Sequence, residues 1–453
     1  MLLISFPASA TPAECATDVR QDRNRKSSDH SGHLIAMFSL ALSGLHGSYY
    51  ELRTQGSNVR LSSLSLMFLL CVFALFVQAE SQDSLTPDKP IGPVPALKLK
   101  LPDEHGYARA QARLGLKYEL GDGVEKDMQH AIWLYQQAAA QGDAEGQYAL
   151  GSLLLSGKGV PRDPREAARL FELAAKQGLA EAQGILGICY GAGMGVEQSY
   201  AASNRWLRLA ADQGNAPAQS NLALNYENGF GMPKDLSAAM DLFQSAARQN
   251  WKVAQNNVGR FYEFGIGVRQ DLPLAMQWYR LAAEQGDADA QYNLGQKYRD
   301  ERAGPPDIGQ AIKYLSLSAN QGNEQAMLKL ASLYKIGAEV PRDDFQAYTW
   351  FKKAADVNNK EGQMQLAWLY ESGEGVVRNY SEAARLYRLA AQQGKIAAQY
   401  RLGYLYRYGL GVDANYDQAR RWLTLAARQN HAAARSELEQ MDQQGQGLNS
   451  EPD

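Results

Sequence analysis

Hydrophobic and polar positions along most of the chain recur with a period of 36 residues. The clearest marker is a Leu-Gly pair that first appears at Leu114-Gly115. Equivalent pairs follow at Leu150-Gly151, Leu186-Gly187, Leu222-Ala223, Val258-Gly259, Leu294-Gly295, Leu330-Ala331, Leu366-Ala367 and Leu402-Gly403. Because no step contains an insertion or deletion, nine units span residues 110–433.

Other positions of each unit keep the same register. A Tyr usually stands three residues after the Gly, first at Tyr118, and a Gly-x-Gly follows in seven units, first at Gly121 and Gly123. A pair of small residues recurs, first at Ala138-Ala139, and Gln-Gly or Gln-Asn usually ends the unit. The regularity indicates a single structural unit that is copied nine times along the chain.

Each unit is predicted to be a helical hairpin. Leu114 and Tyr118 lie at i, i+4 on one face of a first helix, helix A, over about residues 110–120. Gly115 lets the partner helix pack closely, and Gly121 supplies a positive φ after helix A. Asp127 caps the second helix, helix B. Equivalent caps are Asp163, Asp235, Asp271, Asp307, Asp343, Asn379 and Asn415.

This pattern resembles the Sel1-like repeat family. The shared motif is Ala-x-x-x-Leu-Gly-x-x-Tyr-x-x-Gly-x-Gly-Val, then Asp, then Ala-x-x-Trp-Tyr-x-x-Ala-Ala-x-Gln-Gly, and residues 275–286 nearly reproduce its second half. The resemblance covers all nine units. It implies an all-α fold, a right-handed α/α superhelical solenoid of 36-residue helical hairpins related to tetratricopeptide repeats. It also implies a scaffold for protein–protein contact.

The pattern changes after the ninth unit. Residues 434–442 restart helix A, with Leu438 in the leucine register, but Glu439 stands where the Gly is expected. A charged residue at that position predicts a solvated capping helix that ends the stack. The polar tail over residues 443–453 is expected to be disordered.

A strongly apolar segment precedes the repeats. From Leu64 to Val77, 13 of 14 residues are apolar. That length is typical of a signal-peptide core, whereas a membrane-spanning helix needs about 20 apolar residues. Small residues at the −3 and −1 positions, Val77 and Ala79, suit a cleavage site. We therefore expect a signal peptide over residues 59–79, cleavage after Ala79 and a periplasmic location.

Alternatives to this interpretation are a retained N-terminal membrane anchor, a secreted protein and a lipoprotein. A lipoprotein would be acylated at Cys71, but Leu70 precedes it where a small residue is required. A signal peptide begins close to its basic region, so we expect translation to start near Val59 and residues 1–58 to be unstructured. Residues 80–109, with five prolines between 80 and 102, are expected to be a linker and the lead-in to the first helix.

Composition narrows the function classes. The formal net charge is −3, from 46 basic and 49 acidic residues, so nothing favours nucleic-acid binding. Three cysteines in 453 residues exclude a disulfide-stapled fold and a multi-cysteine zinc site. Cleavage would leave only Cys189, which we expect to be a buried small apolar residue.

The resemblance also indicates where a partner would bind. In a solenoid of this class helix A lines the concave face, so the residues flanking Leu-Gly and those four to five after Gly face the groove. Near the C-terminus these are Met364, Trp368, Glu371, Tyr400, Tyr404, Arg407 and Tyr408. In the middle they are Asn256, Arg260, Glu263, Phe264, Tyr292, Gln296, Arg299 and Asp300.

Aromatic and arginine side chains are common at binding hot spots. We therefore expect a peptide or partner helix in the groove, anchored by Trp368 and Tyr404. The alternative is that these aromatic side chains only pack between neighbouring repeats. The sixth unit replaces Gly-x-Gly-Val by the segment 299–307 at unchanged length, so its hairpin should survive.

Nothing in the repeats points to catalysis. His105, His130 and His431 have no partner at metal-ligand spacing, and neither His-Glu-x-x-His nor Gly-x-x-x-x-Gly-Lys-Ser/Thr occurs. We expect no catalytic residue, metal or cofactor, and contact with the membrane only through a transient signal peptide. The resulting hypothesis is a non-enzymatic periplasmic scaffold with a protein partner, in envelope assembly, exopolysaccharide export or signalling regulation. The alternative is a secreted or surface effector that binds a host protein.

Overall fold

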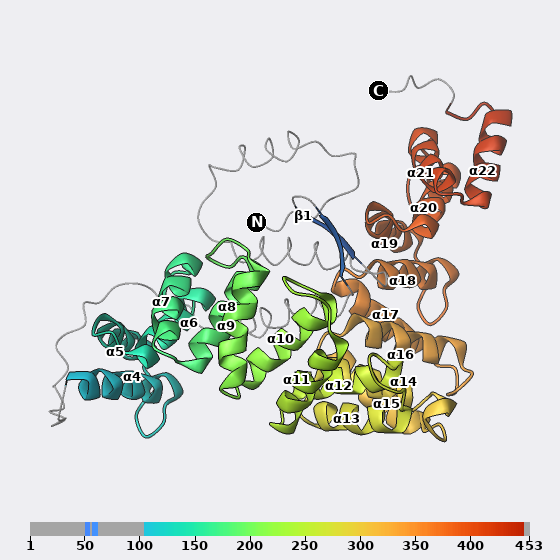
Figure 1. Cartoon of the computed structure of the whole chain (residues 1–453). Helices are drawn as coiled ribbons and strands as arrows, with labels where there is room; N and C mark the ends of the chain where they lie inside the picture. The colour runs from blue at the N-terminus through green and yellow to red at the C-terminus, as the bar shows by residue number, and fades with distance from the viewer. Residues whose placement is uncertain (1–49, 55–56, 62–103, 448–453) are drawn as a thin grey trace, which may run out of the picture. The chain divides into compact units, whose positions relative to one another are not determined.

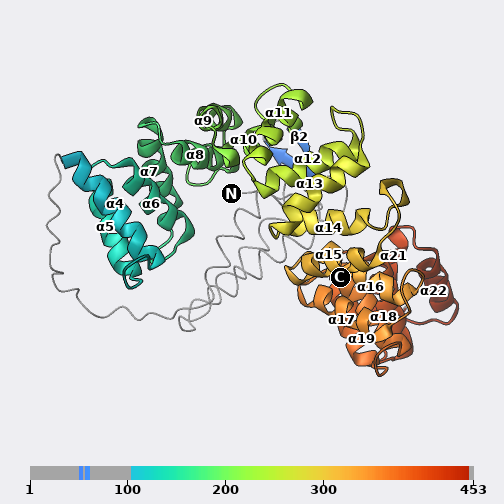
Figure 2. The same ribbon diagram turned by 90° about the horizontal axis from the view of Figure 1, so that it is seen from below.

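The computed structural model describes residues 50–54, 57–61 and 104–447 (Figure 1, Figure 2). The predicted signal peptide lies outside these residues except for 59–61, and the predicted linker lies outside except for 104–109. Residues 448–453 of the predicted disordered tail are also outside.

The repeats are helical throughout, so the predicted all-α hairpin fold is confirmed. Helix A of the nine hairpins corresponds to α4 (Glu104–Leu120), α6 (Ala144–Ser156), α8 (Ala180–Ala192), α10 (Ala216–Asn228), α12 (Lys252–Phe264), α14 (Ala288–Lys297), α16 (Glu324–Ile336), α18 (Lys360–Ser372) and α20 (Ile396–Tyr408). Helix B corresponds to α5 (Met128–Ala140), α7 (Pro164–Lys176), α9 (Tyr200–Asp212), α11 (Leu236–Arg248), α13 (Leu272–Glu284), α15 (Ile308–Asn320), α17 (Asp344–Asp356), α19 (Tyr380–Gln392) and α21 (Tyr416–Arg428). Helix A thus begins earlier than predicted.

Two strands precede the repeats. β1 (Tyr50–Thr54) and β2 (Ser57–Leu61) pair antiparallel, with Tyr50 opposite Leu61. The sequence analysis predicts no structure over residues 1–58, so the hairpin differs from that expectation. The sequence Tyr-Glu-Leu-Arg-Thr alternates apolar and polar residues, which is the period of a strand.

The described chain falls into two compact units. One holds residues 50–54, 57–61 and 104–275, and the other holds residues 276–447. In the second unit, one hydrophobic cluster runs from Leu315 to Leu405 through four hairpins. The first unit has smaller clusters, one of them around Phe171 and Leu186.

A glycine of helix A faces a large residue of helix B inside most hairpins. A Cβ added to Gly151 on α6 would lie 2.8 Å from the Phe171 ring on α7, and the same holds for Gly403 and Leu423. The predicted close approach of the two helices is therefore confirmed. The large residue recurs every 36 positions as Tyr135, Phe171, Leu207, Phe243, Tyr279, Leu315, Phe351, Tyr387 and Leu423, all buried.

The predicted caps of helix B are confirmed. Asp127 accepts a hydrogen bond from the His130 backbone N–H at 2.9 Å. The same bond is made by the other predicted Asp and Asn caps, and Ser199 takes this role in the third hairpin. These bonds satisfy backbone donors that the first turn of a helix leaves unpaired.

A recurring pair of glutamine side chains joins the two helices within most hairpins. The Gln177 side-chain N–H donates to the Gln147 side-chain oxygen at 2.9 Å, from the end of one helix B to the preceding helix A. The same bond joins Gln141 to Gln111, Gln213 to Gln183, Gln249 to Gln219, Gln321 to Gln291, Gln393 to Gln363 and Gln429 to Gln399. In the seventh hairpin, Val357 and Met327 replace both partners.

The last described helix begins a tenth unit that stops after helix A. α22 (Ala432–Gln443) packs on α21, and Leu438 contacts the cluster around Leu423. Glu439 is exposed at the place of the usual Gly. Gly445 and Gly447 stand 36 residues after Gly409 and Gly411 and share their positive φ. Of residues 443–447, predicted to belong to a disordered tail, Gln443 thus ends α22, and residues 444–447 form a turn that continues the repeat pattern.

Candidate functional site

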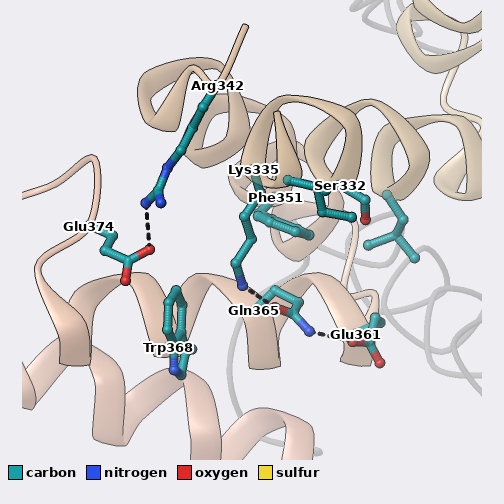
Figure 3. A pocket seen from close by; sticks show the side chains of 10 residues that line it. Ser332, Lys335, Arg342, Phe351, Glu361, Gln365, Trp368 and Glu374 are labelled. Carbon is teal, nitrogen blue, oxygen red and sulfur yellow. Dashed lines mark hydrogen bonds and ion pairs between the residues drawn. The ribbon is translucent and has the colours of Figure 1, made fainter. Parts of the chain in front are cut away.

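The second unit contains a depression of about 500 Å³ between two neighbouring A helices, α16 and α18 (Figure 3). We call it the α16–α18 groove. It is lined by Leu328, Ser332, Lys335, Ile336, Arg342, Phe351, Glu361, Gln365, Trp368 and Glu374. Trp368 is one of the predicted anchors, and it also packs partly on the hydrophobic cluster beneath it. The packing interpretation is therefore confirmed for this residue, and its role as an anchor stays a prediction.

Lys335 and Trp368 form the centre of the groove. The Lys335 ammonium lies 3.9 Å from the Trp368 ring centroid, which is a cation–π contact. The same ammonium donates to the Gln365 side-chain oxygen at 3.0 Å, and Gln365 donates in turn to Glu361 at 2.8 Å (Figure 3). Burial lowers the pKa of Lys335, and the nearby Glu374 carboxylate opposes this shift.

Ion pairs close the two ends of the groove. At one end Arg342 contacts Glu374 at 2.9 Å and Asp344 at 2.7 Å. At the other end Glu361 pairs with Lys395. These pairs are partly exposed, so water screens the attraction between the charges. They do, however, fix the position of both carboxylates beside the groove.

Three predicted tyrosines form a row on α20. The rings of Tyr404 and Tyr408 lie 4.5 Å apart, and Tyr400 stacks on His431 at 4.6 Å. Tyr408 is exposed, whereas Tyr400 and Tyr404 are half-buried. Burial raises the pKa of Tyr400 and of Tyr408, and the Glu437 carboxylate adds to both shifts. The row thus offers aromatic edges, with Tyr408 the most accessible.

Other predicted residues near the C-terminus are engaged within the chain. Glu371 accepts a hydrogen bond from the Tyr387 hydroxyl at 2.7 Å and pairs with Arg401 at 2.8 Å. Burial is the main cause of the raised pKa of Tyr387. Met364 packs on the hydrophobic cluster and does not line the groove. Neither residue is therefore part of the site that we propose below.

Arg407 is also engaged within the chain. It is 5% exposed, and its guanidinium pairs with Glu437 and donates to the side-chain oxygens of Gln440, Gln444 and Gln446. All four partners belong to α22 or to the turn after it. The prediction that Arg407 faces the groove as a free anchor therefore does not fit this geometry, because the capping segment covers the side chain.

The predicted middle set falls into both units and does not form one described site. In the first unit Asn256 and Glu263 are buried and Phe264 is exposed. Arg260 is buried as well, and it contacts Glu227 through two hydrogen bonds of 2.8 and 2.6 Å.

In the second unit Tyr292 packs on the hydrophobic cluster and accepts a 3.4 Å bond from Gln296. Arg299 donates to Glu339 at 2.7 Å, and Asp300 pairs with Lys297 and Arg302. The loop of the sixth hairpin contains a short 3₁₀ helix, η2 (Glu301–Ala303), and Asp307 caps α15 as predicted.

Asp289, near the start of α14, gives a prediction on pH dependence. Burial, with the Asp287 carboxylate nearby, raises the pKa of Asp289 to about 6, although Asn323 donates to it at 3.2 Å. The pKa of an aspartate in the unfolded chain is about 4. Because folding raises the pKa of Asp289, the free energy of unfolding is highest below pH 4, where the carboxyl is protonated in both states. It falls as the pH rises from 4 through 6, because the buried carboxyl must then lose its proton.

Asp289→Asn should therefore stabilise the chain at pH 7.5 by about 3 kcal/mol relative to wild type and have little effect near pH 4. Urea unfolding at several pH values, followed by circular dichroism, measures this difference. The exposed Asp122→Asn serves as the control. A stability difference that stays constant from pH 4 to 7.5 would contradict the assignment.

Most residues of the groove were not predicted from the sequence. The predicted groove positions are two residues before the Leu, one after the Gly, and four to five after the Gly. In the seventh unit these positions are Leu328, Ser332, Lys335 and Ile336, so the signal was present in the sequence. Gln365 and Glu361 stand one and five residues before the Leu of the eighth unit, at positions that this rule does not include. Arg342 and Glu374 lie in the loops between helices, where no helical period applies.

Two further observations concern the part of the chain that the structure describes. Within it, no helix is long and apolar enough to cross a membrane, and no group of three or more His, Cys, Asp or Glu side chains could hold a metal ion. Cys189 is fully buried, as predicted, and burial raises the pKa of its thiol to about 12.

Comparison with known proteins identifies the repeats. The model of the Sel1 repeat matches nine consecutive segments that together cover residues 108–431. The chain belongs to the Sel1 repeat family. Sel1 repeat proteins are non-catalytic scaffolds that bind other proteins. The matched segments begin two residues before the predicted units, at the first residue of helix A in most hairpins.

Solved structures of Sel1 repeat proteins are similar to this chain. One is c5321, described as a protective antigen present in uropathogenic Escherichia coli strains. It is 31% identical in sequence, the match covers 76% of this chain and 82% of c5321, and the TM-score is 0.45. Another is a Sel1 repeat protein from Oxalobacter formigenes. It is 30% identical in sequence, the match covers 56% of this chain and 99% of that protein, and the TM-score is 0.49. None of the curated proteins compared matches the chain.

Proposed function

We propose that this Sel1 repeat protein is a non-enzymatic scaffold that binds a polypeptide segment of a partner protein in the α16–α18 groove. One observation carries the proposal, namely the half-buried Trp368 ring, which lies in a depression of about 500 Å³. A large aromatic side chain that is partly desolvated and surrounded by polar groups is typical of binding hot spots.

The rigidity of the groove favours binding. The Gln363–Gln393 hydrogen bond and the hydrophobic cluster hold α18 against its neighbours on both sides. A groove that is already formed loses little conformational entropy when a partner binds. Ile336, which is 71% exposed at the edge of the groove, adds apolar surface that a partner would cover.

We further propose that the protein is exported and acts in the periplasm, in envelope assembly, exopolysaccharide export or regulation of a membrane sensor. The apolar run from Leu64 to Val77 and the small residues Val77 and Ala79 support export. Cell fractionation with N-terminal sequencing separates the possibilities. A periplasmic protein that begins at Glu80 supports the proposal, release into the medium favours a secreted effector, and a longer membrane-bound form indicates a retained anchor.

Photo-crosslinking in cells tests binding in the groove. A benzoylphenylalanine at Ile336 should give a discrete protein adduct, which mass spectrometry identifies. The matched control is Leu317, an apolar residue of helix B that is 42% exposed in the same unit, and it should give none. Trp368→Ala should reduce the adduct at 336 at least tenfold, since hot-spot truncations cost about 2 kcal/mol or more. Equal adducts at both positions, or none at either, would contradict the proposal.

A further inference from the structure

We propose that the segment bound in the α16–α18 groove carries a carboxylate that pairs with Lys335. The inference rests on the proposed function and names the chemistry of its partner. It starts from the contacts of the Lys335 ammonium, which are the Gln365 oxygen at 3.0 Å and the Trp368 ring at 3.9 Å. Among the described residues, no carboxylate lies within ion-pair distance of this ammonium.

The two repeats that follow on the C-terminal side have an ion pair at the equivalent place. In these repeats, the helix A residue that stands four positions after the Gly contacts a residue of the next helix A, 30 positions later in the sequence. In the eighth and ninth units that pair is ionic, Glu371 with Arg401 and Arg407 with Glu437. In the seventh unit the same register brings Lys335 to Gln365, so an amide stands where the next two units have a charged residue.

The carboxylates beside the groove do not fill this role. Glu374 contacts Arg342 at 2.9 Å, and Glu361 pairs with Lys395. The four charged residues of the groove lining are Lys335, Arg342, Glu361 and Glu374, and only Lys335 lacks a direct partner of opposite sign. The Lys335 ammonium therefore has no direct ion-pair partner among the described residues, and the Glu374 and Glu361 carboxylates act on it only at longer range.

A second lysine of α16, Lys329, does not line the groove. Lys329 is half-buried, and its pKa is lowered by burial and by the Arg299 guanidinium. The nearby Glu339 carboxylate is engaged by Arg299. A partly desolvated ammonium gains more from an incoming carboxylate than an exposed one, because water screens the interaction less.

The lining beside Lys335 indicates what should accompany the carboxylate. Trp368, Phe351 and Ile336 supply apolar surface around the ammonium. A partner with an acidic residue next to an apolar one can form the ion pair and cover this surface at the same time. The charge and the apolar lining together favour an acidic polypeptide segment over a basic or wholly apolar one.

Selection from a random dodecapeptide library displayed on phage, against the immobilised full chain, tests the inference. Enriched peptides should carry Asp or Glu beside an apolar residue. Synthetic copies should bind Lys335→Gln about tenfold to a hundredfold more weakly, as expected for loss of a charged hydrogen bond, and Lys335→Arg should retain most of the affinity. Lys234→Gln, on an exposed loop, is the matched control, and thermal unfolding verifies each fold.

The remaining outcomes separate the two proposals. Some peptides could contain no acidic residue, bind Trp368→Ala more weakly and bind Lys335→Gln as tightly as wild type. Such peptides would overturn the inference and leave the groove as the binding site. Peptides whose affinity is unchanged by both substitutions would contradict both proposals, and so would a selection that enriches no peptide. Peptides with a free and an amidated C-terminus distinguish the two sources of carboxylate. Weaker binding of the amide assigns the C-terminal carboxylate, and equal binding assigns a side chain.

Discussion

Gly195→Ala should destabilise the chain by about 3 kcal/mol or more. Gly195, in the loop after α8, has a φ of +72°, and a Cβ on it would lie 1.8 Å from the Pro164 backbone oxygen. A left-handed alanine costs about 1–2 kcal/mol, and the overlap with a backbone atom adds about 1–3 kcal/mol. The neighbouring backbone cannot relax unless the third hairpin moves away from the second.

Gly123→Ala is the matched control for this substitution. Gly123 holds the same place in the first hairpin and a φ of +71°, but nothing lies within 4 Å of an added Cβ. The reason is that the second Gly of each Gly-x-Gly contacts helix B of the preceding repeat, which the first hairpin lacks. Gly123→Ala should cost only about 1 kcal/mol.

Urea unfolding followed by circular dichroism and by hydrogen exchange compares the two variants. Hydrogen exchange is needed because repeat proteins can unfold in parts, and a single global free energy then loses its meaning. Protection should fall mainly in α7 and α8 for Gly195→Ala. Equal destabilisation by the two substitutions would contradict the contact between repeats.

The second large effect is expected at Arg407. Arg407→Met should remove the buried ion pair with Glu437 and leave that carboxylate without its partner. Breaking a buried pair from one side costs about 3–5 kcal/mol. Because α22 is the last described helix and packs mainly on α21, the loss should appear as local opening. Amide protection on α22 should fall at least a hundredfold.

Arg385→Met is the control for Arg407→Met. Arg385 forms a surface pair with Glu382, and both side chains are largely exposed, so the change should stay within about 0.5 kcal/mol. Unchanged protection of α22 in Arg407→Met, together with weaker partner binding, would show instead that Arg407 is an anchor for the partner.

The hairpins could be predicted from the sequence because their determinants are local and repeated. Asp127 and its equivalents cap helix B through a side chain three residues away from its donor, and Gly151 faces Phe171 within one hairpin. Nine copies of the same signal make each assignment secure. The alternating pattern of β1 is short and occurs once, and it was not predicted.

The functional surface was predicted only in part, for physical reasons. The rule for groove positions finds Trp368, but it cannot tell a free cation from a paired one. Arg407 and Lys335 occupy equivalent positions, and the difference between them is the residue 30 positions later, Glu437 or Gln365. That dependence becomes visible only once the packing of neighbouring A helices is known.

Hydrogen–deuterium exchange on the full chain, alone and with the partner captured at Ile336, tests binding in the α16–α18 groove most directly. We predict that the partner slows amide exchange in α16 and α18, and that exchange in α15 and α19 is unchanged. Slower exchange confined to the B helices, or to α20 and its tyrosine row, would contradict the account.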